Sequence, residues 1–184
     1  MKKLFLLILL FFWVTYPVSA QEIPLTVTPS LPPAPQVITY PLPYPGLLPD
    51  NPLYGLKVLR DRLVSIFITD PQQQATFDLL QADKRLSASM YLLQGTAQKE
   101  QLALDTISKA ENYFFYAIEN ATIAKKQGED INGFLGTMTT AAAKHEQILT
   151  GFAHARDKSF QHAVEQQEER VDGFVKQLDA LKKA

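Results

Sequence analysis

The chain contains no cysteine. This absence excludes disulfide bonds, thiolate metal sites, covalently attached haem and lipid attachment through a cysteine. A chain of 184 residues is nevertheless long enough to bury one adequate hydrophobic core without such cross-links. We therefore expect one packed domain that is stabilised by its core.

An excess of charge of either sign is also missing. The sequence has 18 Lys+Arg and 19 Asp+Glu, which gives a formal net charge of −1 at pH 7. Domains that bind nucleic acids or anionic lipids through charge carry a clear basic excess. The composition therefore predicts no nucleic-acid partner, and it gives no electrostatic indication of lipid binding.

Long apolar runs are absent except at the start of the chain. A basic pair precedes the apolar run from Leu4 to Val14, Pro17 breaks the run, and small residues follow at Val18-Ser19-Ala20. This order is typical of a secretory signal peptide over residues 1–20, cleaved before Gln21; the alternative is a retained N-terminal anchor. We expect an exported mature protein (periplasmic, cell-surface or extracellular) with no membrane span after cleavage.

Prolines divide the rest of the chain in two. Ten of them lie between Pro24 and Pro52, and only Pro71 follows. Because proline cannot continue a helix interior or a central strand, residues 21–51 are predicted to form an extended, polyproline-II-like stalk. Residues 52–184 then form the folded domain.

Helical periodicity fills that domain. Helices are expected from Leu53 to about Ile68, from Pro71 to a stop at Gly95, then up to Gly128, and in two further segments separated near residues 156–159. Apolar residues recur at alternating steps of three and four in the last three helices, as in a heptad seam. With short connections, this pattern predicts an all-α fold: an antiparallel helical bundle of four to five helices. The seam positions are Ala103, Ile107, Ala110, Phe114, Ala117, Ala121 and Ala124, then Ile131, Leu135, Met138, Ala142, His145, Leu149 and Phe152, and finally Phe160, Val164, Gln167, Val171, Phe174, Leu178 and Leu181.

The first two helices have sequence signals of their own. The sequence Asp50-Asn51-Pro52 places two capping residues before a proline, so Asp50 or Asn51 is predicted to cap the first helix. Asp70 stands directly before Pro71 and is predicted to cap the second helix. The first helix carries its large apolar residues on one face, which is expected to point inward. These residues are Leu53, Leu56, Leu59, Leu63, Ile66 and Phe67.

No arrangement of catalytic or metal-binding residues is evident. His145-Glu146 begins like a zinc-protease motif, but Leu149 stands where the second histidine is needed. Ala142 replaces the glutamate that a di-iron Glu-x-x-His motif requires before His145. We therefore expect no enzyme activity, no cofactor and no metal. The alternative is a ligand-, metal- or haem-binding bundle that uses His145 with the core methionines Met90 or Met138.

Aromatic residues are the remaining candidates for a binding surface. Four consecutive rings, from Tyr113 to Tyr116, sweep about 300° around a helix, so they cannot all lie in one seam. Tyr113, Phe115 and Tyr116, together with Tyr54 on the outer side of the first helix, are predicted to form a partner surface. Alternatively, the stalk covers these rings by docking onto the bundle. The residues that would dock it are Tyr40, Tyr44, Leu47 and Leu48.

The stretch from Pro45 to Lys57, Pro-Gly-Leu-Leu-Pro-Asp-Asn-Pro-Leu-Tyr-Gly-Leu-Lys, resembles the opening signature of a bacterial family of exported proteins of unknown function. The resemblance continues through Asp70-Pro71 and Arg85-Leu86 to the segment from Lys144 to Leu149. Gln72-Gln73-Gln74 departs from the lysines usual in that family. The resemblance implies export and a helical domain, and it supplies no catalytic residues. We expect a non-enzymatic interaction or scaffold module of the cell envelope with a protein partner.

Overall fold

The computed structural model describes residues 38–95, 97–153 and 157–183, so the predicted signal peptide, its cleavage site and the first part of the stalk lie outside the described residues. The described ranges contain helices and no strand, which confirms the all-α prediction. The helices are α2 (Tyr54–Phe67), α3 (Pro71–Leu93), α4 (Glu100–Lys126), α5 (Asn132–Ala153) and α6 (Lys158–Lys183), with a short 3₁₀ turn, η1 (Ala97–Lys99), before α4. None of the helices in these ranges is both long and apolar enough to cross a membrane.

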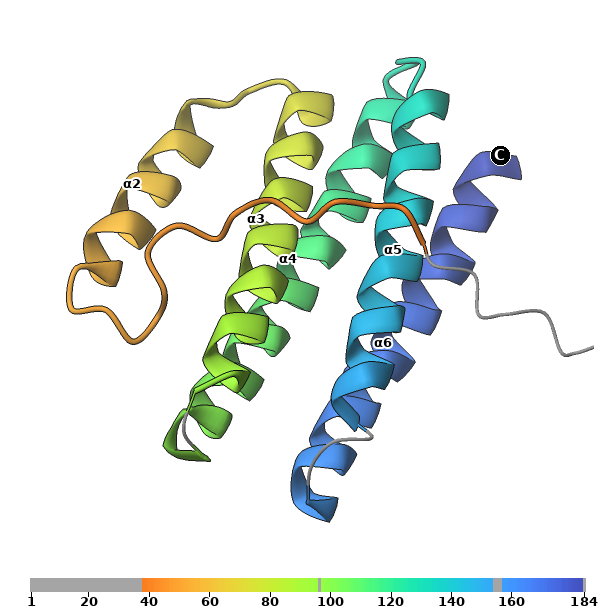
Figure 1. The fold of residues 1–184 in the computed structure, drawn as a ribbon. Coiled ribbons are helices and arrows are strands. Elements are labelled where there is room, and N and C mark those ends of the chain that lie inside the picture. Colours follow the sequence, from red (N-terminus) through yellow and green to blue (C-terminus); the bar gives the residue numbers. More distant parts are fainter. Residues whose placement is uncertain (1–37, 96, 154–156, 184) are drawn as a thin grey trace, which may run out of the picture. The chain divides into compact units, whose positions relative to one another are not determined.

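Four of the helices form the bundle. α3 packs along α4, α5 packs along α6, and α4 also packs against α6 (Figure 1). Short connections between consecutive helices make α3 antiparallel to α4 and α5 antiparallel to α6 (Figure 1). The heptad seams supply the core: every predicted seam position of α4 is buried, and Phe114 stacks on Phe174 of α6 with ring centroids 5.3 Å apart.

Local sequence signals explain where α3 begins and where α4 ends. The Asp70 side chain accepts a hydrogen bond from the Gln73 backbone N–H, and Pro71 opens the helix, so α3 is capped as predicted. α4 ends at Lys126, and Gly128 just beyond its C-cap has a φ of 88°, which suits glycine. The Glu129 N–H donates to the Ala124 carbonyl, which completes the terminal turn.

The predicted cap of the first helix is wrong. α2 begins at Tyr54, and its N-cap, Leu53, makes no side-chain capping bond. The Asp50 carboxylate instead lies 2.7 Å from the Lys99 ammonium, because the turn before α2 brings it beside η1. The Asn51 side chain accepts from the Leu53 N–H within that turn.

Residues 38–49, here called the strap, run as an extended segment across α3 and α5 (Figure 1). Tyr40 and Leu42 pack against the core, and Pro45 is buried. The compact unit that includes the bundle therefore also includes the strap, and it begins well before the predicted boundary at Pro52.

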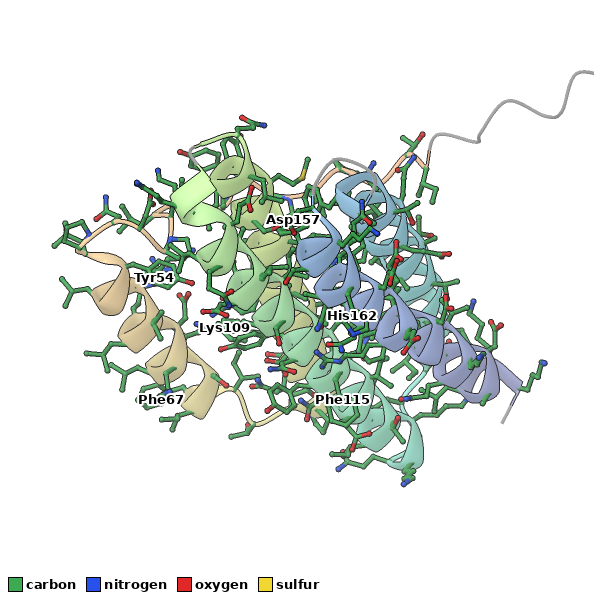
Figure 2. All side chains as sticks on the ribbon, turned by 90° about the horizontal axis from the view of Figure 1, so that it is seen from below. Tyr54, Phe67, Lys109, Phe115, Asp157 and His162 are labelled. Carbon is green, nitrogen blue, oxygen red and sulfur yellow. The ribbon has the colours of Figure 1, made fainter. Side chains whose placement is uncertain are left out.

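The predicted inward face of the first helix is also wrong. α2 lies at the margin of the bundle, and its large apolar residues are exposed to solvent (Figure 2). Tyr54, Val58 and Ile68, which were expected on the outer side, are half-buried, and Asp61 is buried. α2 therefore meets the bundle with its more polar face. We call the exposed set the outer face of α2: Leu53, Leu56, Leu59, Leu63, Val64, Ile66 and Phe67.

Candidate functional site

Polar side chains on α3 determine how the rest of the molecule covers it. Ala75, Leu79, Ala82 and Leu86 form its apolar stripe toward the core. At about 100° per residue, polar residues flank this stripe on both sides. One flank carries Asp78, Gln81 and Arg85, and the other carries Asp83 and Ser87; all five are buried. Buried polar groups of this kind need partners, since burying them unpaired costs several kcal/mol.

On the second flank, three helices meet at a buried charge cluster. His145 on α5 has no exposed surface. Its Nδ1 lies 3.0 Å from Glu111 Oε1 on α4, and its Nε2 lies 3.1 Å from Asp83 Oδ1 on α3. The Tyr40 hydroxyl of the strap donates to Asp83 Oδ2 at 2.7 Å. The Phe114 ring closes the site edge-on, with its centroid 5.1 Å from that of the imidazole.

These contacts fix the charge of the imidazole. Burial by itself lowers the pKa of His145, but the charge of Glu111 and the hydrogen bonds to both carboxylates raise this pKa to about 9. At neutral pH the ring is therefore an imidazolium that donates from both nitrogens. Burial and the hydrogen bond to Asp83 raise the pKa of Tyr40, so its phenol stays neutral and remains a donor.

The hydrogen bonds of His145 also bear on whether this residue could bind a metal ion or haem. Both nitrogens of His145 are engaged by carboxylates, so no lone pair points into a cavity. Met138 is fully buried, whereas Met90 is half-buried and lines a 580 Å³ hollow beside Tyr40. Within the described ranges, no three His, Asp or Glu side chains are arranged to hold a metal ion. Of the other histidines, His162 is exposed, and His154 lies outside the described residues.

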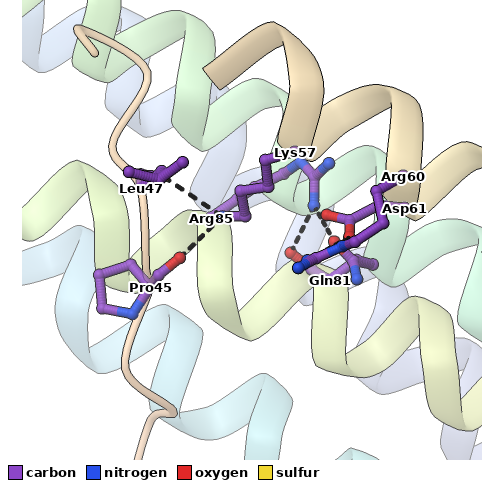
Figure 3. A network of polar contacts seen from close by, with 7 residues as sticks. All are labelled: Pro45, Leu47, Lys57, Arg60, Asp61, Gln81 and Arg85. Atoms are coloured by element: carbon purple, nitrogen blue, oxygen red, sulfur yellow. Dashed lines mark hydrogen bonds and ion pairs between the residues drawn. The ribbon is translucent and has the colours of Figure 1, made fainter. Parts of the chain in front are cut away.

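On the first flank, the buried polar groups of α3 bond within α3 and to α4, and α2 contributes one hydrogen bond. The Arg85 guanidinium binds the Gln81 side chain at 2.7 Å and stacks 4.0 Å from the Tyr113 ring centroid. The Gln74 amide of α3 donates to the Ser65 hydroxyl of α2 at 3.0 Å. Asp61 of α2 is buried on this side and pairs with Arg60 at 2.6 Å (Figure 3).

A lysine joins α2 to the strap. The Lys57 ammonium donates to the carbonyls of Pro45 at 2.7 Å and Leu47 at 3.4 Å (Figure 3). A groove of about 510 Å³ opens between the two segments. Its lining combines apolar side chains with three cations and includes Leu47, Leu56, Lys57, Arg60 and Lys84.

The outer face of α2 holds seven of the fourteen large apolar side chains that are exposed in the described part of the chain. The exposed fractions of its side chains run from 43% at Val64 to 82% at Phe67. Fully burying a large apolar side chain contributes roughly 1.5–3 kcal/mol. Even half of that over these residues is on the order of 5–10 kcal/mol, which is available to whatever covers the face. Contiguous exposed apolar surface on one helix indicates an interaction site.

The aromatic residues predicted to form a partner surface differ in burial, although the Tyr113 and Tyr116 rings meet edge-on with centroids 6.2 Å apart. Phe115 and Tyr116 are exposed neighbours on α4 with centroids 6.0 Å apart. Tyr113 lies half-buried under Arg85. Burial raises the pKa of Tyr54, which faces the bundle rather than solvent.

The residues predicted to dock the stalk also differ in burial. Tyr40 and Leu48 are half-buried against the bundle, whereas Leu47 is exposed. Tyr44 is 76% exposed and touches only the edge of the Tyr91 ring, with centroids 6.4 Å apart. Docking of the strap therefore rests on Tyr40, Leu42 and Pro45.

Comparison of the chain with models of protein families, with curated proteins and with solved structures finds no match. The resemblance of residues 45–57 to a family of exported proteins therefore stays a prediction.

The pKa of His145 generates a prediction about pH. Because this pKa is raised above the unfolded value of 6.5, its contribution to stability is full below pH 6.5 and is lost as the pH rises through about 9. The free energy of unfolding should fall across that window, by on the order of 3 kcal/mol. Chemical denaturation at a series of pH values measures this loss.

The His145→Gln variant should lose that pH dependence, and the exposed His162→Gln variant should keep it. If His145→Gln fails to fold, titration of the imidazole by NMR in the unmodified protein gives the pKa directly. An imidazole that titrates near its ordinary value would contradict the charged cluster.

Tyr40→Phe should loosen the strap, because it removes a hydrogen bond to a charged group worth about 1–3 kcal/mol. Limited proteolysis should cut residues 38–49 faster in this variant. Tyr44→Phe is the matched control: it leaves the ring contact to Tyr91 in place, and no hydrogen bond joins the Tyr44 hydroxyl to another described residue. Equal cleavage rates for the two variants would show that the hydroxyl of Tyr40 does not hold the strap.

Proposed function

We propose that this protein is a non-enzymatic interaction or scaffold module of the cell envelope, and that α2 attaches it to its partner. The observation that carries the proposal is the outer face of α2, which leaves seven apolar side chains in solvent on a helix whose other face is already packed. The bundle behind α2 is the rigid body that this attachment positions.

The contacts of α2 support this division of roles. Its bundle side is polar and specific, with Ser65 bonded to Gln74 and Lys57 bonded to the strap. Such contacts fix the orientation of the helix while leaving its apolar residues free. A helix that belonged only to the core would bury those residues instead.

The alternative, a metal- or haem-binding bundle, receives less support. It relies on His145, whose two nitrogens already bond to Glu111 and Asp83. The cluster is better explained as an electrostatic connection between three helices and the strap. Export, cleavage before Gln21 and membership of the bacterial family of exported proteins remain parts of the proposal that rest on the sequence.

The proposal predicts that the mature chain, from Gln21 onward, co-sediments with envelope fractions of the organism that encodes it. Leu63→Glu should abolish this binding, because it places a charge in the centre of the outer face. Ile123→Glu is the matched control: Leu63 is 49% exposed and Ile123 is 44% exposed, but Ile123 lies on α4. Binding that survives Leu63→Glu, or that Ile123→Glu removes equally, would contradict the assignment of the face.

A further inference from the structure

We infer that the outer face of α2 lies on the surface of an anionic phospholipid bilayer, with its apolar side chains in the acyl region and the cations around it at the headgroups. The inference deepens the proposed function and rests on it. It assigns α2 the role of an in-plane anchoring helix, without any membrane-spanning segment.

The width of the apolar surface favours a broad partner. At about 100° per residue, the residues from Ile66 round to Val64 cover about 160° of the helix circumference. A two-helix seam of a and d positions is narrower than this, since it uses two residues in seven. A single partner helix would leave part of the face exposed, whereas a lipid surface can cover all of it.

The charges on α2 favour an anionic partner. The helix carries Lys57, Arg60 and Arg62, and its one acidic residue, Asp61, is buried on the bundle side. On the helical projection, Arg62 lies beside Ile66 at one border of the outer face, and Arg60 lies within the face, between Phe67 and Val64. The stem of Arg62 can cover apolar surface while its guanidinium extends toward headgroups, whereas Arg60 is paired with Asp61 at 2.6 Å.

The groove beside α2 extends this positive region. Lys57, Arg60 and Lys84 line it, and Leu56 belongs both to the groove and to the outer face. Burial lowers the pKa of Lys57, and the charges of Arg85, Lys84 and Arg60 lower it further, whereas the charge of Asp61 acts in the opposite direction. Positive charge is thus concentrated here in a chain whose net charge is −1. The overall composition hides this local asymmetry.

The same charges disfavour a second copy of the chain as the occupant. Leu56, Leu59, Leu63 and Ile66 follow heptad spacing, so two α2 helices could pair along them. Arg60 and Arg62 would then flank the seam in both copies and meet like charges. The position of α2 also suits a planar partner: it lies at the margin of the bundle, on the other side of α3 from α5 (Figure 1), and Figure 2 places Phe67 at the outer edge of this helix.

Vesicle co-sedimentation tests the inference. The probes are vesicles of pure phosphatidylcholine and vesicles of phosphatidylcholine and phosphatidylglycerol in equal parts, with the chain from Gln21 onward so that the apolar run at Leu4 to Val14 cannot contribute. The protein should bind the anionic vesicles and bind the neutral ones much more weakly. Leu63→Glu should abolish binding and Ile123→Glu should leave it unchanged.

The charge contribution has its own variant. Arg62→Gln combined with Lys84→Gln should weaken binding to anionic vesicles by about fivefold for each charge removed, and it should leave the weak binding to neutral vesicles unchanged. Equal binding to both kinds of vesicle, or no effect of this variant, would overturn the role of the anionic headgroups.

The remaining outcomes separate this inference from the proposed function. If the protein binds envelope fractions but not vesicles, the lipid inference is overturned and the proposed interaction module is retained. If protease treatment of the envelope then removes the binding to envelope fractions, the partner is a protein. A dimer in sedimentation analysis that Leu63→Glu dissociates would overturn the inference in favour of a second copy. Failure to bind either envelope or vesicles would overturn both.

Discussion

The structure depends on the two polar flanks of α3. A helix with an apolar stripe on one side ordinarily leaves its polar residues in water, but Asp78, Gln81, Asp83 and Arg85 are all buried. Because unpaired burial is costly, these groups are bonded to other side chains, some on α3 itself and others on the strap, α4 and α5. The strap and His145 cover one flank, and α2 covers the other. On that side Ser65 of α2 bonds to Gln74 and Asp61 is buried, so α2 meets the polar flank with its own polar side and leaves its leucines outward.

The charge cluster shows what this arrangement costs and what it achieves. An imidazolium between two carboxylates has lost its hydration, and Glu111 Oε2 is buried without a hydrogen-bond partner among the described residues. Such a site adds little net stability compared with an apolar core, but removing one member leaves an uncompensated charge. It therefore specifies one register of α3, α4 and α5, and through Tyr40 it specifies the path of the strap. The strap in turn binds Lys57 and so helps to orient α2.

Periodicity was sufficient to predict the bundle, because the seams of α4, α5 and α6 bury apolar residues against apolar residues. Periodicity failed for α2. The rule that the apolar face of a helix points inward assumes that the neighbouring surface is apolar, but the flank of α3 that α2 meets is polar. Asp70 could be predicted as a cap from local sequence, whereas Asp50 was drawn away by Lys99, which is distant in sequence. His145 could be placed in a seam, but its partners Asp83 and Glu111 stand next to seam positions on other helices. Only the packed structure brings them together.

Cysteine labelling tests the orientation of α2 most directly, since the chain has no cysteine of its own. Leu63→Cys and Ser65→Cys variants place one thiol on the outer face and one beside Gln74, two positions apart on the same helix. The account predicts rapid reaction of the Leu63→Cys variant with a maleimide and slow reaction of the Ser65→Cys variant in the folded protein, with equal rates in denaturant. Slow labelling of Leu63→Cys together with fast labelling of Ser65→Cys would show that α2 packs with its leucines inward and would contradict the central claim.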